Sequence, residues 1–287
     1  MKINTYQIIE DEKKLVYQEL YDKSENLIHY IDHTTKPKSK KKYKYNDNNL
    51  MIEEIELNDN NILNTITFDY NTEGKLINQK LFFGKSLFEE TTISYNNEGL
   101  KKTIFQDGEE ILRTEKNENG KNSTIKFFDN KILTEMQICE YNSPKNSSEI
   151  NLFDGDKNLI GKRVKEFDTD DNIVKFQEFD NKNNLLSESV YEFKNKLMTK
   201  ETYRDYIGHS EEFIFIKRYD ENKNITLTET RTLTNDLLEF HRRKYNSKNK
   251  LIEESGFSRG DFDSIYGTSL NNEEFHFIHE YVDINSA

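Results

Sequence analysis

Apolar and polar residues recur along this chain in units of about a dozen residues. In the clearest stretch, 167–190, Phe167-Asp168 is followed by small polar residues and an aliphatic pair, and Phe179-Asp180 starts the next unit. Asp and Asn side chains hydrogen-bond backbone groups two residues further on and tolerate left-handed backbone angles, so these polar runs predict turns. Residues 132–138 alternate apolar and polar side chains as a β-strand does. Each unit therefore predicts one strand and one turn.

The residue that begins each unit can be placed along most of the chain, mainly at intervals of 10 to 14 residues. Degenerate units around 116–120 and 206–208 fill the two long gaps. The anchors are Tyr45, Leu57, Tyr70, Phe83, Tyr95, Phe105, Phe128, Tyr141, Phe153, Phe167, Phe179, Phe193, Tyr219, Leu233 and Tyr245. Such short connections join only antiparallel strands, and a twisted sheet of this size curls, splits or closes. We expect an all-β fold, a long antiparallel meander of roughly 18 short strands from 12-13-residue repeats, strongly curved or rolled.

The pattern divides the chain into one long domain and a tail. Residues 1–252 are predicted to form a single elongated β-repeat domain, interrupted by an irregular lysine-rich loop at 34–44 that is exposed or guards a sheet edge. Residues 253–287 abandon the spacing. Because repeat arrays end in atypical units, we expect an atypical C-terminal cap there, with a binding segment as the other interpretation.

Composition sharpens this picture. The chain is 33% hydrophobic and 33% charged, which approaches the composition of disordered proteins, but the regular placement of its 19 Phe and 16 Tyr indicates a folded chain. A thin or single-layer sheet reconciles the two observations. The net charge of −12 disfavours nucleic acid as a ligand and suits a basic partner or solubility.

Targeting segments and the single cysteine bear on where the protein is located. The N-terminus lacks a signal-peptide core, and no run approaches the ~18 apolar residues of a membrane span, so we expect a cytoplasmic protein. The only cysteine, Cys139, cannot form an internal disulfide and is expected to be an inert thiol.

No motif indicates catalysis. His276 and His279 are predicted to point to opposite sides of a strand, too far apart for a shared metal. The runs 154–158 and 168–172 resemble the first half of a calcium loop but lack its glycine and its bidentate Glu, so simple Asx turns are the better interpretation. We therefore predict a non-enzyme without catalytic, cofactor or metal residues, and the binding residues stay unassigned.

The repeat resembles a known family. Its units are similar to the YD repeats of bacterial Rhs-type proteins and, more loosely, to bacterial variants of MORN repeats, over residues 15–252. The signature occurs literally at Tyr21-Asp22 and Tyr219-Asp220, and with Phe at Phe128-Asp129, Phe153-Asp154, Phe167-Asp168 and Phe179-Asp180. The resemblance implies a β-shell architecture and a place in bacterial toxin systems, where small members look like immunity proteins.

From the resemblance and the acidic charge we expect a protein-binding module, an immunity or antitoxin-type protein that neutralises a basic bacterial toxin domain by direct binding. A structural shell or a glycan- or surface-recognition repeat protein is the alternative, with exposed Tyr and Phe as stacking platforms. An enzyme built on the irregular segments 203–211 or 253–287 is a third reading.

Overall fold

The computed structural model describes residues 1–96, 99–117, 121–207, 212–258 and 274–282. Within those residues the chain forms 22 strands and one 3-10 helix, Ser143–Lys145. The strands are β1 Lys2–Ile9, β2 Glu12–Tyr21, β3 Leu27–Asp32, β4 Ser39–Tyr45, β5 Met51–Asn58, β6 Asn61–Tyr70, β7 Leu76–Phe83, β8 Ser86–Asn96, β9 Gly99–Gln106, β10 Glu109–Asn117, β11 Ser123–Asp129, β12 Ile132–Asn142, β13 Ser147–Asp154, β14 Leu159–Phe167, β15 Ile173–Asp180, β16 Leu185–Lys194, β17 Leu197–Asp205, β18 Phe213–Tyr219, β19 Ile225–Thr232, β20 Leu237–Tyr245, β21 Leu251–Ser258 and β22 Glu274–Val282.

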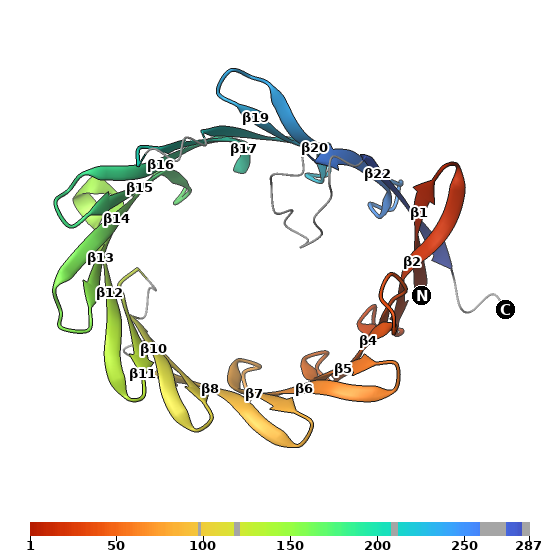
Figure 1. The fold of residues 1–287 in the computed structure, drawn as a ribbon, viewed down its shortest axis with the longest axis horizontal. Coiled ribbons are helices and arrows are strands. Elements are labelled where there is room, and N and C mark those ends of the chain that lie inside the picture. The colour runs from red at the N-terminus through yellow and green to blue at the C-terminus, as the bar shows by residue number, and fades with distance from the viewer. Residues whose placement is uncertain (97–98, 118–120, 208–211, 259–273, 283–287) are drawn as a thin grey trace.

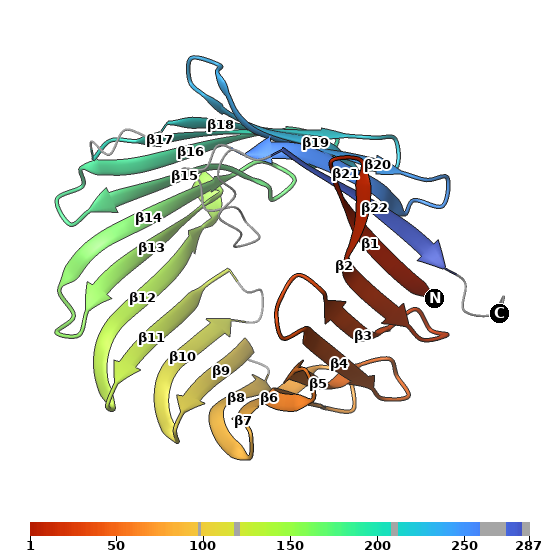
Figure 2. The ribbon, with the colours of Figure 1, turned by 45° about the vertical axis from the view of Figure 1, so that its right-hand side comes forward.

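The strands form one closed antiparallel barrel. Each strand pairs with its neighbours in the chain, and β22 pairs with β1, with Ile3 opposite Tyr281 and Thr5 opposite His279. The ring is complete in Figure 1 and, from another side, in Figure 2. The prediction of an all-β, antiparallel, strongly curved sheet is confirmed. The predicted number of about 18 strands is wrong, because 22 strands close the sheet on itself.

The repeat pattern undercounts because it leaves out strands near the two ends of the chain. β1 precedes the first unit, and β22 follows the segment where the spacing lapses. The irregular loop predicted at 34–44 is wrong for residues 39–44, which belong to β4. Its lysines lie on both faces: Lys41 donates to Glu54 Oε1 at 2.8 Å, and Lys44 on the other face pairs with Glu53. A strand that is wetted on both faces tolerates this charge.

The tail also contributes to the wall. β21 runs across residue 252, where the repeat domain was expected to end, and β22 lies between β21 and β1. Residues 253–258 and 274–282 of the expected cap are therefore strands that complete the ring. The rest of that segment, 259–273 and 283–287, lies outside the described residues.

The aromatic anchors coincide with irregularities that bend the sheet. The register shifts by one residue at Tyr21, Tyr45, Tyr70, Phe167 and Tyr245, each immediately before a polar turn. Bulges of this kind bend a strand and increase its twist. A bulge repeated from hairpin to hairpin gives the sheet the steady curvature that closure requires.

Strand register assigns most of the 16 tyrosines to one face of the sheet, which we call the tyrosine face. Its tyrosines are Tyr17, Tyr21, Tyr30, Tyr43, Tyr45, Tyr70, Tyr95, Tyr141, Tyr191, Tyr203, Tyr219, Tyr245 and Tyr281. Most of the buried residues lie on it too, among them the small residues Thr5, Thr91, Thr114, Ser148, Ser187, Ser189 and Thr230. Side chains converge on the concave side of a curved sheet and cover one another there. The tyrosine face therefore lines the inside of the barrel.

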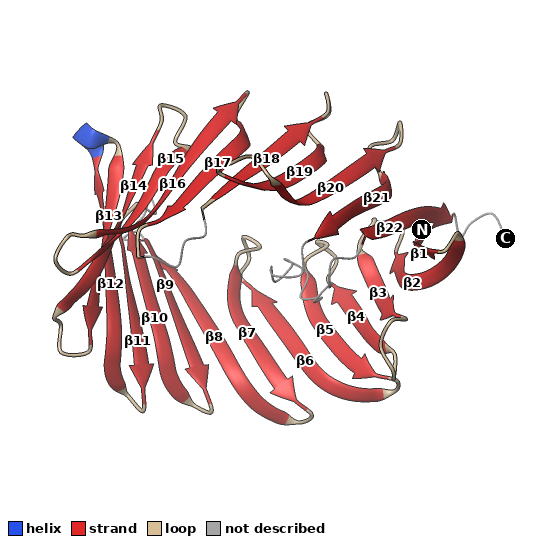
Figure 3. Cartoon of the chain, turned by 45° about the horizontal axis from the view of Figure 1, so that its top comes forward, coloured by secondary structure: helices blue, strands red, loops and turns tan. Residues whose placement is uncertain are grey.

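The wall is a single layer of strands, as Figure 3 shows. The accessible surface is 18617 Å², whereas a compact monomer of 34.2 kDa exposes about 12,900 Å². At ~4.8 Å per strand, 22 strands give a ring about 34 Å across, and strand tilt widens it. Side chains from opposite walls cannot meet across that width, so each wall acts as a separate surface.

Candidate binding surface

A group of tyrosines and carboxylates covers the inner wall where the barrel closes. We call it the tyrosine–carboxylate cluster; its members are Tyr17, Glu19 and Tyr21 on β2, Tyr30 and Asp32 on β3, Tyr43 and Tyr45 on β4, Glu54 on β5 and Tyr281 on β22. Register sets these residues side by side: Glu19 lies opposite Tyr30 on β3 and opposite Ile3 on β1, and Ile3 lies opposite Tyr281. Tyr281 reaches the cluster only because the ring closes.

Direct contacts order the cluster. The rings of Tyr17 and Tyr30 stack with their centroids 6.0 Å apart and their planes 21° from parallel. The Tyr21 hydroxyl donates to Glu19 Oε2 at 2.9 Å. These contacts fix broad aromatic surfaces beside a carboxylate.

Several inner tyrosines also connect neighbouring hairpins. The hydroxyl of Tyr45 donates to the carbonyl of Leu27 at 2.9 Å, and that of Tyr281 donates to the carbonyl of Leu251 at 2.7 Å. Tyr70, Tyr95, Tyr219 and Tyr245 make the same kind of bond to Met51, Leu76, Met198 and Ile225. The aromatic anchor of the repeat is therefore a structural tie as well as a surface group.

The charge of the cluster comes from its carboxylates, because its phenols are neutral. Burial, followed by nearby carboxylates, raises the pKa of all six tyrosines above the ordinary value, with Asp32 acting on Tyr30 and Glu19 acting on Tyr21 and Tyr281. Burial also lowers the pKa of His279, whose Nδ1 lies 2.9 Å from Thr5 Oγ1. Around neutral pH the phenols are neutral. Within the described part of the chain, Lys41 is the one cation bonded to a carboxylate of the cluster, and its partner is Glu54. The cluster is therefore aromatic with net negative charge.

Such a surface suits cationic side chains. Lys and Arg groups are attracted to the faces of aromatic rings and to carboxylates, and tyrosine is among the residues that dominate protein interfaces. Each strand contributes only one to three of these residues. The sequence pattern places tyrosines one unit apart, but only the register shows that six of them share one wall.

The residues singled out in the sequence lie as follows. His276 and His279 lie on opposite faces of β22, as predicted. The runs 154–158 and 168–172 are Asx turns, as predicted: Asp168 Oδ1 accepts from the backbone N–H groups of Asp170 at 2.8 Å and Asn172 at 2.9 Å. Cys139 is half-buried on β12, and its thiol lies 3.6 Å from the carbonyl of Lys121.

Other observations bear on catalysis and membranes. No group of three or more His, Cys, Asp or Glu among the described residues is arranged to hold a metal ion. His209 and residues 208–211, part of one candidate catalytic segment, lie outside the described part of the chain. Across the described ranges, no helix has the length and apolar character that crossing a bilayer requires.

Comparisons with known proteins give distant similarities. No family model matches the sequence, and no curated protein matches it significantly. A porin-like protein from Bacteroides uniformis ATCC 8492 aligns over 97% of this chain and 96% of its own, at 10% identity and a TM-score of 0.31. A porin-like protein from Bacteroides vulgatus ATCC 8482 aligns over 85% and 98%, at 12% identity and a TM-score of 0.32. The TcdB2-TccC3 structure aligns over 87% of this chain but 17% of its own, at 11% identity and a TM-score of 0.25. None of these similarities assigns the chain to a family.

Proposed function

We propose that this chain is a non-enzymatic binding protein that takes a positively charged protein partner at the tyrosine–carboxylate cluster. The observation that carries the proposal is the gathering of six half-buried tyrosines with Glu19, Asp32 and Glu54 on one inner wall. Stacked, hydrogen-bonded rings are preorganised, so little side-chain entropy is lost on binding. The net charge of −12 attracts the same kind of partner over a longer range.

The barrel dimensions support a partner that inserts a segment. A ring about 34 Å across, even with side chains on its inner face, is wide enough to admit an α-helix of about 10–12 Å or a hairpin against one wall. The resemblance to YD repeats favours one biological setting, in which the partner is a basic toxin domain and this chain neutralises it in the cytoplasm. The alternative is a shell or a surface-recognition protein that stacks sugars on the same tyrosines.

The test is affinity capture of the tagged chain from its native lysate at moderate salt, followed by titration of the captured protein. We expect one stoichiometric basic partner, and we expect the variant Glu19→Gln/Glu54→Gln to bind it about tenfold more weakly or worse, because both changes remove charge facing the partner. The matched control is Glu192→Gln/Glu140→Gln, which removes two carboxylates from the outer face.

Two outcomes contradict the proposal. A partner that binds the cluster variant and the control equally well would move the interface away from the cluster. Empty captures, repeated with crosslinking, together with binding on a glycan array would favour the surface-recognition alternative. Far-UV circular dichroism of each variant checks that the barrel is intact.

A further inference from the structure

A cavity of about 610 Å³ indents a different inner wall, across β10 to β15. Figure 1 shows β12 to β15 on the side of the ring opposite β1 to β4, so the cavity is remote from the tyrosine–carboxylate cluster. Register explains the hollow. One row across the sheet runs Lys116, Ser123, Cys139, Ile150 and Arg163, with the short side chains in its middle.

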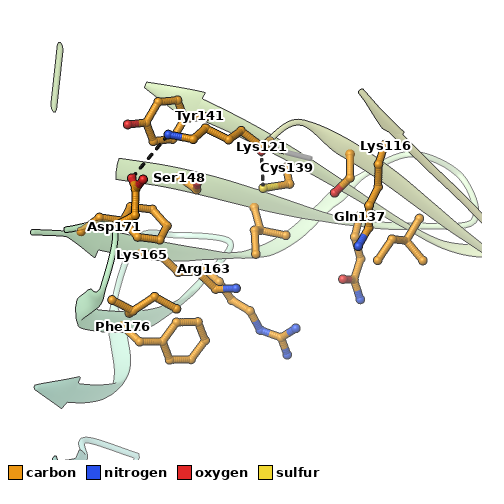
Figure 4. Close-up of a pocket in the computed structure, with 15 residues that line it drawn as sticks. Lys116, Lys121, Gln137, Cys139, Tyr141, Ser148, Arg163, Lys165, Asp171 and Phe176 are labelled. Carbon is orange, nitrogen blue, oxygen red and sulfur yellow. Dashed lines mark hydrogen bonds and ion pairs between the residues drawn. The ribbon is translucent and has the colours of Figure 1, made fainter. Parts of the chain in front are cut away.

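The next row of register partners repeats the arrangement. Tyr141 lies opposite Ser148, Ser148 opposite Lys165, and Lys165 opposite Phe176. Long or aromatic residues thus surround a floor of small ones, and Figure 4 shows these side chains around the hollow. The cavity follows from side-chain size at fixed register positions.

The rim of the cavity is cationic in an acidic protein. Lys116, Lys121, Arg163 and Lys165 line it, against the single carboxylate of Asp171. Lys121 is engaged, with its Nζ 3.5 Å from Asp171 Oδ1 and 4.1 Å from the centre of the Tyr141 ring. Lys116 and Lys165 form no ion pair with any residue that the structure describes.

One hydrogen bond orients the Arg163 side chain and leaves part of its guanidinium group free to bind a ligand. Its Nε donates to Glu178 Oε1 at 2.7 Å, which leaves the terminal guanidinium nitrogens available. Arg163 and Lys165 are two residues apart on one strand and both line the cavity, so their Cα atoms are about 7 Å apart. Glu178 balances the charge of Arg163, whereas Lys165 has no ion-pair partner among the described residues. An anion placed between the two side chains is therefore attracted by the unpaired charge of Lys165 and can accept from the free N–H groups of Arg163.

The remaining walls are apolar. Ile125, Ile150, Ile173 and the ring of Phe176 line the same cavity. Its volume falls within the ~300–1,000 Å³ of small-molecule sites, which combine apolar walls with a few placed polar groups. A cavity of this volume is too small for a folded protein segment. A ring compound with an anionic group fits it.

We propose that this cavity is a binding site for a small phosphate monoester whose organic part carries a ring. Arg163 and Lys165 hold the phosphate, Lys binding it as a point charge and Arg through its terminal N–H groups. The ring lies on Ile150 and Phe176, over the floor formed by Ser148 and Cys139. Lys116, at the far end of its row, binds further negative charge on a longer ligand. This site is independent of the proposed partner surface.

Cys139 supplies a local test, because it is the only cysteine in the sequence and lies on the cavity floor. The probes are phenyl phosphate and adenosine 5′-monophosphate, with inorganic phosphate and adenosine as incomplete ligands. We expect the two esters to bind with a Kd of about 1 mM or tighter and to slow alkylation of Cys139 by iodoacetamide. The incomplete ligands bind more weakly because each lacks one half of the interaction.

Two variants on the same strand separate the site from general charge effects. Lys165→Gln is expected to weaken ester binding about tenfold, the effect of losing one charged hydrogen bond. Lys162→Gln removes the same charge from the outer face of β14 and is expected to leave binding unchanged. Equal affinities for both variants, or ester binding that leaves the alkylation rate unaltered, would overturn the assignment. Protection of Cys139 by poly-glutamate but not by either ester would overturn it in favour of an acidic protein segment.

Discussion

At the residue scale, one acceptor group shapes the repeated turn. In five turns an Asp accepts from the backbone N–H four residues on, and in each of these an Asn at that later position donates its side-chain amide to the same carboxylate. In three other turns the side-chain amide oxygen of an Asn accepts from the backbone N–H four residues on; these are Asn46, Asn71 and Asn246. The turn therefore requires an acceptor oxygen at its first residue. The negative charge of an Asp strengthens the hydrogen bonds to that oxygen.

The turn carboxylates should contribute to stability against acid. The hydrogen bonds from the Asn lower the pKa of Asp154, Asp168 and Asp180 below the ordinary value. A carboxyl whose pKa is lower in the folded state contributes stability above the unfolded value of about 3.9, and that contribution is lost as the pH falls through the folded value. The Tm should therefore drop below about pH 4, and less steeply for Asp154→Asn/Asp168→Asn/Asp180→Asn, which keeps the acceptors.

Thermal unfolding of both proteins from pH 6 to pH 2.5 checks this expectation. Parallel pH profiles would show that the turn carboxylates do not contribute to acid stability. The Asn-based turns at 46, 71 and 246 indicate that the variant keeps its fold at neutral pH.

At the element scale, the sequence predicts what is local. Turn chemistry and alternation give the strand-and-turn unit, its antiparallel pairing and its face. They miss strands whose signal is not local. β1 has no preceding unit. The lysines of β4 resemble a loop because local propensity contains no information on Glu53 and Glu54, which lie opposite them on β5. The two-residue turns also hide strands, since they lack the long polar run of the repeat.

One of those turns offers a stability test. Asn130 and Lys131 connect β11 to β12 with φ of 48° and 67°. Two successive left-handed residues define a hairpin turn in which Asn-Gly is favoured, because glycine has no Cβ to clash. Lys131→Gly should raise the free energy of unfolding by about 0.5–1 kcal/mol. The exposed ion pair of Lys131 with Glu109 contributes little.

Urea unfolding midpoints measure the effect. Lys126→Gly, in the middle of β11, is the matched control and should lower stability by about 1 kcal/mol, because glycine weakens a strand interior. A lower midpoint for Lys131→Gly would contradict the turn assignment.

At the scale of the whole molecule, closure is the feature that no local pattern specifies. An open array would leave one edge of β1 and one edge of β22 unpaired, and exposed edges favour aggregation. Bulges at the anchors bend every part of the sheet alike until the two edges meet. Closure also creates the candidate site, because it brings Tyr281 to Glu19 through β1. The tyrosines could be identified from the sequence. Their arrangement on one wall could not, because it depends on pairing between the two ends of the chain.

The most direct test of this account is a crosslink across the closing seam. Asn4 and Glu280 are register partners on the outer face, so their Cα atoms lie about 5 Å apart. In a Cys139→Ser background, Asn4→Cys/Glu280→Cys should be joined within one chain by a short thiol crosslinker. The control pair Asn4→Cys/Lys126→Cys should stay unlinked. Efficient intramolecular linkage of the first pair alone is the result expected of a closed barrel. No linkage of the seam pair in folded protein would contradict the closed barrel and the tyrosine–carboxylate cluster that depends on it.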